Sequence, residues 1–368
     1  MTSIFLKKQI KSLIIQASLL LSDQHHQAIK TRIESQRRYS LMTLLESYLL
    51  AVPFLDDIIF FKTLIQSRLA RRKTIKKAPH LQLLPDAQEK LANIKPNQYN
   101  YDCYIISPGA SIARLSSCEK EIIERGFVVT FNSSCFFEIK SDLSFQETSN
   151  NSSYTQGLHE CLQFKINQGL ISPDSIILKN AWKTSGHLVD NAQVSPIVNY
   201  PKKPYLLMDD FFPHFAVSES CAKKIFTKYL FYDRSSYFNA ISSLVIIALV
   251  ISQLGFKNIY FIGTDLINSC HFYKIPNSVN ESLSPFLQKL ENKVASIHAT
   301  AQGDFSVVEA LQLILSFLKK INPELQFWSP HKASPLCKFF PIQKKLSDYG
   351  GISAHDLQLI LEQIQNES

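Results

Sequence analysis

A long apolar stretch followed closely by a short one constrains the fold more than any other feature of the chain. Residues 241 to 254 (ISSLVIIALVISQL) are apolar on nearly every side, and Gly255 follows them as a glycine commonly follows a helix. Residues 258 to 262 (NIYFI) combine β-branched and aromatic side chains without a charge, which is typical of a strand buried on both faces. The stretch therefore predicts a buried helix over 236 to 254 that leads into a central parallel strand.

An acid stands just after the end of this strand, which runs into Gly263, Thr264 and Asp265. In open α/β sheets, ligands bind beyond the carboxyl ends of the strands. We therefore expect Asp265 to form the floor of a ligand site. The preceding helix is not expected to span a membrane, because a span needs roughly 20 apolar residues, and Asn239, Ser242 and Gln253 interrupt this one.

The rest of the chain from residue 101 to 330 alternates between short apolar runs and helical patterns. This alternation predicts an α/β fold with a doubly wound, mostly parallel sheet and helices on both faces. Residues 209 to 213 are predicted as a loop, and residues 269 to 284 as a long mobile loop, because they lack periodicity. The other predicted strands are 101–106, 126–131, 143–146, 175–178, 204–208 and 325–328, and the other predicted helices are 112–125, 157–167, 222–230, 286–297 and 307–319.

The N-terminal region predicts a helical extension over residues 1 to 77, since it lacks glycine and its only proline is Pro53. Helical spacing of apolar residues extends to about residue 75, and the charge run 71 to 77 (RRKTIKK) ends the region. Two interpretations stay open: packing on the main domain or another subunit, and docking on an anionic membrane face. A proline-containing linker with a short helix is expected over 78–100, the catalytic domain over 101–345 and a helical tail over 346–368.

Charge and cysteine usage restrict the partners and the compartment. The 368-residue chain carries a formal net charge of +8, which suits an anionic partner such as an activated sugar, an anionic membrane or nucleic acid. Its seven cysteines are odd in number and widely spaced, without a CxxC pair, which argues against zinc and against a disulfide framework. We expect reduced thiols and a cytoplasmic protein, since lysines interrupt the apolar residues of the N-terminus.

Further candidate site residues occur at the ends of predicted strands and the starts of helices. The turn at residues 107 to 111 (SPGAS) lets backbone N–H groups approach a phosphate, or is an ordinary turn in which Ser111 caps a helix. Asn132 ends the next strand, and Ser242 and Ser243 begin the apolar helix, where hydroxyls either face the same rim or cap the helix. His298 is a lone histidine, which is more often structural than catalytic.

Taken in order, these motifs resemble the bacterial sialyltransferases of glycosyltransferase family 42, over about residues 101 to 340. The family's Gly-x-Gly-Pro-Ser-Leu turn corresponds to 107–112, the asparagine ending its second strand to Asn132, and its Thr-Ser-Gly to 242–244. Its Leu-Gly-Tyr-Lys-Glu-Ile-Tyr-Leu-Ser-Gly-Ile-Asp block corresponds to 254–265 (LGFKNIYFIGTD), and its Cys-Pro-Asn-Ser to 328–331. The 254–265 block also resembles flagellar nonulosonate transferases and pterin pyrophosphokinase-like proteins.

The resemblance implies a GT-A-like, Rossmann-type fold. It also implies an inverting transferase that moves sialic acid or a related nonulosonate from a CMP donor to a glycan hydroxyl, with no metal or other cofactor. It implies that His298 is the general base and that Tyr273 contacts the departing phosphate; the family's other tyrosine falls on Ile267. Arg234 lies a few residues before the family arginine and is a further candidate phosphate contact. The implied donor-binding residues are Gly109, Ala110, Ser111, Asn132, Ser242, Ser243, Gly263, Asp265, Ser329 and Pro330.

Several alternatives remain beside this interpretation. His271 and His331 are the rivals of His298 as base. The enzyme alternative uses another nucleotide sugar or a pyrophosphate donor, and the non-enzyme alternative is an inactive nucleotide-binding scaffold. The expected partners are a nucleotide-sugar donor, a glycan or glycolipid acceptor of the bacterial surface, an anionic membrane at its inner face, and further copies of the chain, but not nucleic acid.

Overall fold

The structure is a computed structural model that describes the α/β part of the chain and little of the N-terminal region. The expected helices within 1–77 and at 222–230, and nearly all of that at 286–297, lie outside the described residues. Positions 65, 69, 72 and 76 are described individually, and each is helical. The other described residues are 84–147, 152–179, 205–207, 209–211, 237–239, 242–266, 271–275, 278–279, 281–283, 286 and 306–366.

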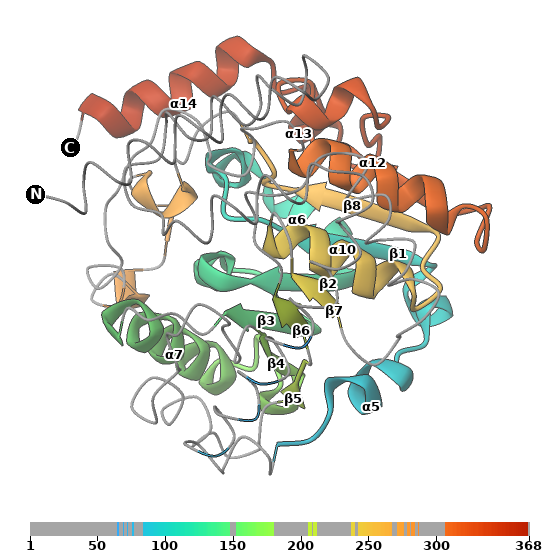
Figure 1. Cartoon of the computed structure of the whole chain (residues 1–368). Coiled ribbons are helices and arrows are strands. Elements are labelled where there is room, and N and C mark those ends of the chain that lie inside the picture. The colour runs from blue at the N-terminus through green and yellow to red at the C-terminus, as the bar shows by residue number, and fades with distance from the viewer. Residues whose placement is uncertain are drawn as a thin grey trace, which may run out of the picture.

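A parallel sheet of seven strands forms the centre of the molecule, in the order β5-β4-β3-β2-β1-β8-β9 (Figure 1). All seven strands predicted from the sequence are present. A separate pair of parallel strands, β6 (Asp209–Phe211) and β7 (Tyr237–Asn239), stands outside this sheet. The strands of the large sheet are β1 (Asp102–Ile106), β2 (Phe127–Phe131), β3 (Leu143–Glu147), β4 (Ile176–Lys179), β5 (Tyr205–Leu206), β8 (Asn258–Ile262) and β9 (Gln326–Trp328).

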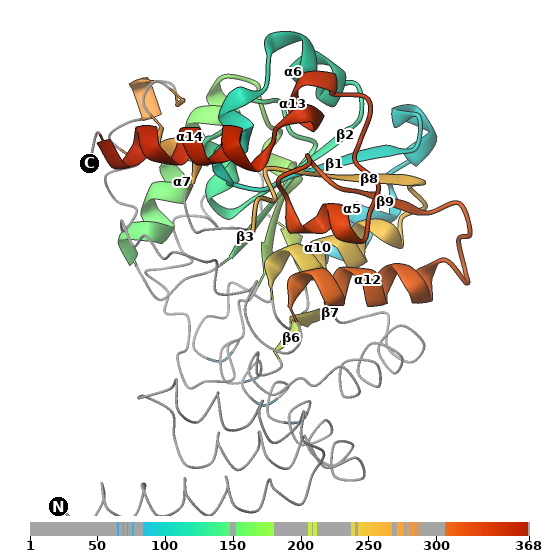
Figure 2. The ribbon, with the colours of Figure 1, turned by 90° about the horizontal axis from the view of Figure 1, so that it is seen from above.

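Helices cover both faces of the sheet, so the fold is doubly wound as predicted (Figure 2). One face packs against α5 (Ala87–Ala92), α10 (Ser243–Ser252) and α12 (Val307–Leu318). The helices on the other face are α6 (Ser117–Glu124), α7 (Ser152–Asn167), α13 (Ser347–Gly351) and α14 (Ala354–Asn366). The short 3₁₀ turns that matter below are η3 (Ala110–Arg114), η4 (Asn132–Phe136), η6 (Phe272–Lys274) and η7 (Glu281–Leu283).

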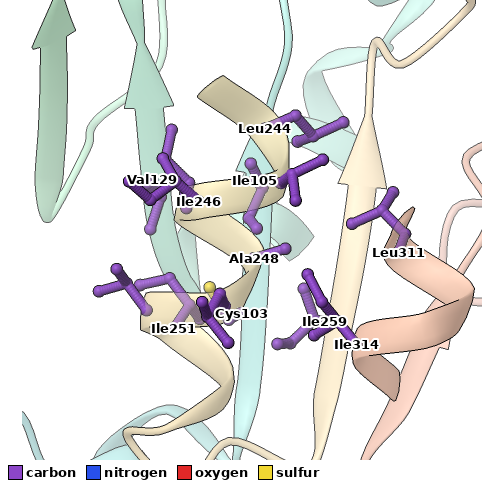
Figure 3. Close-up of a cluster of buried hydrophobic side chains, with 14 of the residues drawn as sticks. Cys103, Ile105, Val129, Leu244, Ile246, Ala248, Ile251, Ile259, Leu311 and Ile314 are labelled. Atoms are coloured by element: carbon purple, nitrogen blue, oxygen red, sulfur yellow. The ribbon is translucent and has the colours of Figure 1, made fainter. Parts of the chain in front are cut away.

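Helix α10 is the central element of the first face, as its apolar sequence predicts. Every residue from Leu244 to Ser252 is buried, against β1, β2, β8 and α12 (Figure 3). Each fully buried leucine or isoleucine stabilises the fold by about 1.5–3 kcal/mol relative to its exposure to water. Gly255 follows the helix with φ +94°, a conformation that glycine adopts without strain. Within the described ranges, every helix falls short of the length and apolar character that a bilayer span requires.

The predicted boundaries are wrong at four places on described residues. The helix expected over 157–167 begins earlier, at Ser152. The helix expected over 112–125 is divided into η3 and α6, because Ser116 starts a new helix with a capping box to Glu119. The helix expected from residue 236 begins only at Ser243, since residues 237–239 form β7 and the Ser242 side chain caps the first turn. Residues 209–211, expected within a loop, form β6 and pair with β7.

The segment 269–284, expected to be a long mobile loop, contains ordered turns where the structure describes it. Turns η6 and η7 form within it, and Phe272 is fully buried. The Phe272 N–H donates to the Pro108 carbonyl at 3.0 Å, which ties this segment to the turn after β1. The prediction missed this because a single buried aromatic residue leaves no periodic pattern in the sequence.

Candidate functional site

The centre of the sheet is a topological switch point. Strands β1 and β8 lie side by side in parallel, and β1 leads into α6 on one face while the chain after β8 reaches α12 on the opposite face. At such a point the connections diverge, and ligands of doubly wound folds bind in the crevice outside the carboxyl ends of these two strands. The turn around Gly109 follows β1, and Asp265 follows β8, so the two motifs predicted from sequence meet there.

The Gly109 turn lies directly on the segment that follows β8. The Gly109 N–H donates to the Gly263 carbonyl at 2.9 Å, and the Ser107 and Thr264 hydroxyl oxygens lie 2.8 Å apart. A Cβ at Gly109 would lie 2.2 Å from the Gly263 carbonyl oxygen and 2.6 Å from Asp265 Oδ2. Only glycine therefore fits this approach. Gly109 is half-buried, whereas Ala110, Ser111 and Gly263 are buried.

Asp265 is buried beneath this turn and accepts three hydrogen bonds from the protein. The Ser111 N–H donates to Oδ2 at 3.0 Å, and the Ser111 hydroxyl donates to Oδ1 at 2.5 Å. His331 Nε2 lies 3.0 Å from Oδ1. Burial alone would raise the pKa of the Asp265 carboxyl, but the hydrogen bond and electrostatic attraction of His331 and the bonds from Ser111 together hold the pKa below its ordinary value.

Tyr349, from the C-terminal helix α13, joins the same buried group. Its hydroxyl oxygen accepts from the Gly263 N–H at 2.7 Å and lies 2.8 Å from Ser111 Oγ. The Tyr349 ring meets the His331 ring edge-on at 5.5 Å. His331 is fully buried, and its Nδ1 has no hydrogen-bond partner among the described residues. Sequence reasoning missed Tyr349, because nothing near it in the chain indicates a contact with residues so distant in sequence.

The N-terminus of α10 lies at the same edge of the sheet. The Ser242 hydroxyl accepts from the Leu244 N–H at 3.1 Å and caps the helix. Ser243 is the first residue of α10 and is half-buried. Lys179, the last residue of β4, donates to Ser243 Oγ at 2.5 Å and is fully buried. Sequence reasoning also missed Lys179, although a lysine at the end of a buried strand is a recognisable signal.

Half-buried side chains surround the Gly109 turn on its outer side. His271 forms an antiparallel bridge with Gly109, and its ring stacks on that of Tyr273 at 5.2 Å. The Tyr273 ring lies 6.2 Å from the Phe136 ring of η4. The first residue of η4 is Asn132, whose φ of +49° is in the left-handed region that asparagine tolerates better than most residues.

The structure describes two of the four remaining predicted site residues. Ser329 and Pro330 are buried directly before His331 in the chain, and they form hydrogen bonds with the segment 341–343. His298 and Arg234 lie outside the described residues. In the part of the chain that the structure describes, no three histidine, cysteine, aspartate or glutamate side chains converge as metal ligands would.

The site combines a buried layer with an outer layer of half-buried side chains, Asn132, Ser243, His271 and Tyr273. The buried layer consists of Ser111, Asp265, His331 and Tyr349, which are joined by hydrogen bonds beneath the Gly109 turn. The outer layer offers a hydroxyl, an amide, an imidazole and a phenol. Hydroxyl and amide groups can hydrogen-bond to the polar edges of a small molecule, and Lys179 Nζ bonds to one of these hydroxyls, that of Ser243.

Comparisons with known proteins add a likeness in structure alone. No protein-family model matches the sequence, and no curated protein matches it. The sialyltransferase CstII from Campylobacter jejuni, solved with the substrate analogue CMP-3FNeuAc, is 17% identical with a TM-score of 0.42, over 68% of this chain and 89% of that chain. Monomeric CstII is 16% identical with a TM-score of 0.36, over 71% and 99%. Scores of this size assign neither a family nor an activity to this chain.

Proposed function

We propose that the protein is an inverting glycosyltransferase that moves an acidic sugar, sialic acid or a related nonulosonate, from a CMP-activated donor to a glycan hydroxyl. The observation that carries this proposal is the Gly109 turn held over Asp265 at the switch point between β1 and β8. A rigid glycine turn at that place is where doubly wound folds bind nucleotides. The sequence blocks around Gly109, Asn132, Ser243 and Asp265 support a CMP donor through their resemblance to family 42.

The proposed reaction needs a base on the acceptor side and positive charge on the donor side. The acceptor oxygen bonds to the anomeric carbon while the bond from that carbon to the phosphate oxygen breaks. The hydroxyl proton passes to His298 as general base, and the electron pair of the broken bond leaves with CMP. Tyr273, Arg234 and the Lys179–Ser243 pair are proposed to stabilise the departing phosphate, so the reaction would require no metal.

CMP should raise the melting temperature of the protein more than UDP or NAD does at equal concentration. A ligand that binds the folded state alone stabilises it by RT ln(1 + [L]/Kd), so the size of the shift ranks the affinities. The measurement is a thermal-shift series over the three nucleotides, with cytidine as a control for the contribution of the phosphate. Equal shifts for all three nucleotides, or none, would contradict the CMP-sugar proposal.

The same series, combined with a sugar-transfer assay, separates the two alternatives. A larger shift with UDP or with a pyrophosphate-containing nucleotide would favour a transferase with another donor. CMP binding without sugar transfer to any glycan or glycolipid hydroxyl would favour an inactive nucleotide-binding scaffold.

We also infer that the acceptor lies at an anionic membrane and that residues near the charge run 71–77 contact it. Ile65 and Leu69 are 58% and 48% exposed, and Arg72 and Lys76 are exposed. At 100° per residue these four helical positions fall within about 60° of one another on one face. An apolar and basic face suits anionic lipid, whereas nucleic acid would leave the two apolar side chains without a partner.

Vesicles that contain anionic lipid should therefore bind the protein, and neutral vesicles should not. The double substitution Ile65→Ser and Leu69→Ser should weaken this binding in a cosedimentation assay, because it removes the side chains that enter the bilayer. Leu359→Ser is the matched control, since Leu359 is a 43% exposed leucine of α14, far along the chain from the basic run. Equal losses in both variants, or preferential binding to RNA, would contradict the membrane proposal.

A further inference from the structure

We propose that the C-terminal segment is part of the donor site. Tyr349 is the positioning residue, and its hydroxyl holds the Gly109 turn in the conformation that binds the donor. This inference rests on the proposed function, because the ligand concerned is the CMP portion of the donor. Tyr349 belongs to α13, in the segment that the sequence assigns to a tail outside the catalytic domain. Its side chain is nevertheless 1% exposed and lies within the buried layer of the site.

The hydrogen bonds of the buried layer have a single consistent direction. The Ser111 hydroxyl gives its one proton to Asp265 Oδ1, so in its contact with Tyr349 it acts as acceptor. Tyr349 therefore donates to Ser111, and its oxygen accepts from the Gly263 N–H. Burial, and the nearby Asp265 charge, raise the pKa of Tyr349, which keeps the donating proton in place.

The Tyr349 hydroxyl thereby fixes both sides of the Gly109 turn. On one side it holds the Gly263 N–H, and the carbonyl of the same Gly263 accepts from Gly109. On the other side it holds the Ser111 hydroxyl, two residues after Gly109. Glycine turns move easily when their neighbours do, so a bond at each side is what keeps this turn in one shape.

Tyr349 is itself held firmly in place, as a positioning residue must be. Its N–H donates to Glu119 Oε1 at 2.9 Å, and the same Glu119 side chain caps α6 through Ser116. Its ring packs edge-on against His331, which also bonds to Asp265. Removing the hydroxyl while keeping the ring therefore changes two hydrogen bonds and little of the packing.

The test compares Tyr349→Phe with Tyr260→Phe. Tyr260 is also buried, at 3% exposure, in the same face of the core, but its hydroxyl lies 3.5 Å from Asp102 at the start of β1, the sheet edge opposite to Gly109. Each variant loses one buried hydroxyl, so both should melt at a lower temperature than the unsubstituted protein. CMP binding is measured by calorimetry at a temperature at which all three proteins are folded.

We expect the Kd for CMP to rise about tenfold in Tyr349→Phe, because the turn loses the two hydrogen bonds that hold its shape, and to stay unchanged in Tyr260→Phe. A purely structural role would lower the melting temperature of both variants and leave both Kd values at that of the unsubstituted protein, which would overturn this inference alone. Absence of CMP binding by the unsubstituted protein would overturn the proposed function as well.

If Tyr349→Phe does not fold, a comparison in the presence of an osmolyte tests the proposal instead. The osmolyte TMAO favours the folded state without binding at a specific site, so all three proteins are then compared in TMAO. A Tyr349→Phe chain that stays unfolded there would overturn the proposal, because the hydroxyl would then be needed for folding itself rather than for the shape of the turn.

Discussion

His298→Ala should lower the turnover of sugar transfer by about 10²–10⁴-fold, the usual contribution of a general base. The Kd for CMP should change little, because a base that takes the acceptor proton does not contact the nucleotide. The measurement is kcat with saturating acceptor, together with CMP binding by calorimetry. A loss of CMP affinity as large as the loss of kcat would instead assign His298 to the donor side.

The two rival histidines are the controls, and the structure gives each a different expectation. His331 is fully buried and bonded to Asp265, so His331→Ala should mainly lower the free energy of unfolding. His271 is half-buried beside Gly109 and stacks on Tyr273, so it is the rival that reaches the rim. Turnover that survives in His298→Ala but is lost in His271→Ala would transfer the role of base to His271.

Asp265→Asn should lower the free energy of unfolding by about 3 kcal/mol, the upper end of the scale for leaving a buried hydrogen-bond donor without its partner. The groups that face the carboxylate are the Ser111 N–H, the Ser111 hydroxyl and His331 Nε2, and all three donate to it. An amide offers one acceptor oxygen and places an NH₂ against the remaining donors, so at least one buried donor loses its partner. Denaturant unfolding at neutral pH measures the effect.

Asp102→Asn is the matched control at the opposite edge of the sheet. Asp102 is also buried, but it bonds to Lys345, whose side chain is 45% exposed and can turn into solvent. Its substitution should therefore have a smaller effect on the free energy of unfolding than that of Asp265. Equal losses in the two variants would contradict the role assigned to the buried layer.

The difference in the free energy of unfolding between Asp265→Asn and the unsubstituted protein should become smaller as the pH falls. The pKa of Asp265 is lowered from 3.8 in the folded state, so its stabilising contribution is complete above the unfolded pKa and is lost as pH falls through the folded value. The two unfolding free energies should therefore converge below about pH 3.8 and differ most at neutral pH. A difference that is constant across this range would show that the carboxylate charge does not contribute.

The sheet is the part of the fold that the sequence predicts best, because buried parallel strands appear as short apolar runs between helical patterns. Residues 258–262 illustrate this, since their predicted bounds are those of β8. The predicted start of α10 lies seven residues before the observed one. Tyr237 and Phe238 suit either a helix or a strand, and only the pairing of this segment with β6 decides between the two. The break at Ser116 depends on a capping box that the apolar pattern hides.

The sequence likewise predicts some residues of the candidate site and misses others. The places of Gly109 and Asp265 follow from a local rule, that polar residues after parallel strands meet at one edge of the sheet. Their donor-binding role remains a prediction. Tyr349 follows no local rule, and although Lys179 is recognisable as a lysine at the end of a buried strand, its pairing with Ser243, 64 residues away, arises only through tertiary packing. No spacing pattern in the sequence indicates such a pair.

The bond between Ser111 and Tyr349 joins residues that are 238 positions apart. A ribosome that adds about 5–20 residues per second therefore exposes the Gly109 turn roughly 10–50 s before it delivers Tyr349. During most of that time β1 also lacks its neighbour β8, so the nascent chain presents an open strand edge that favours association with other chains. The candidate site is thus among the last features of this protein to form during synthesis, and chaperones have a long interval in which to bind the incomplete nascent chain.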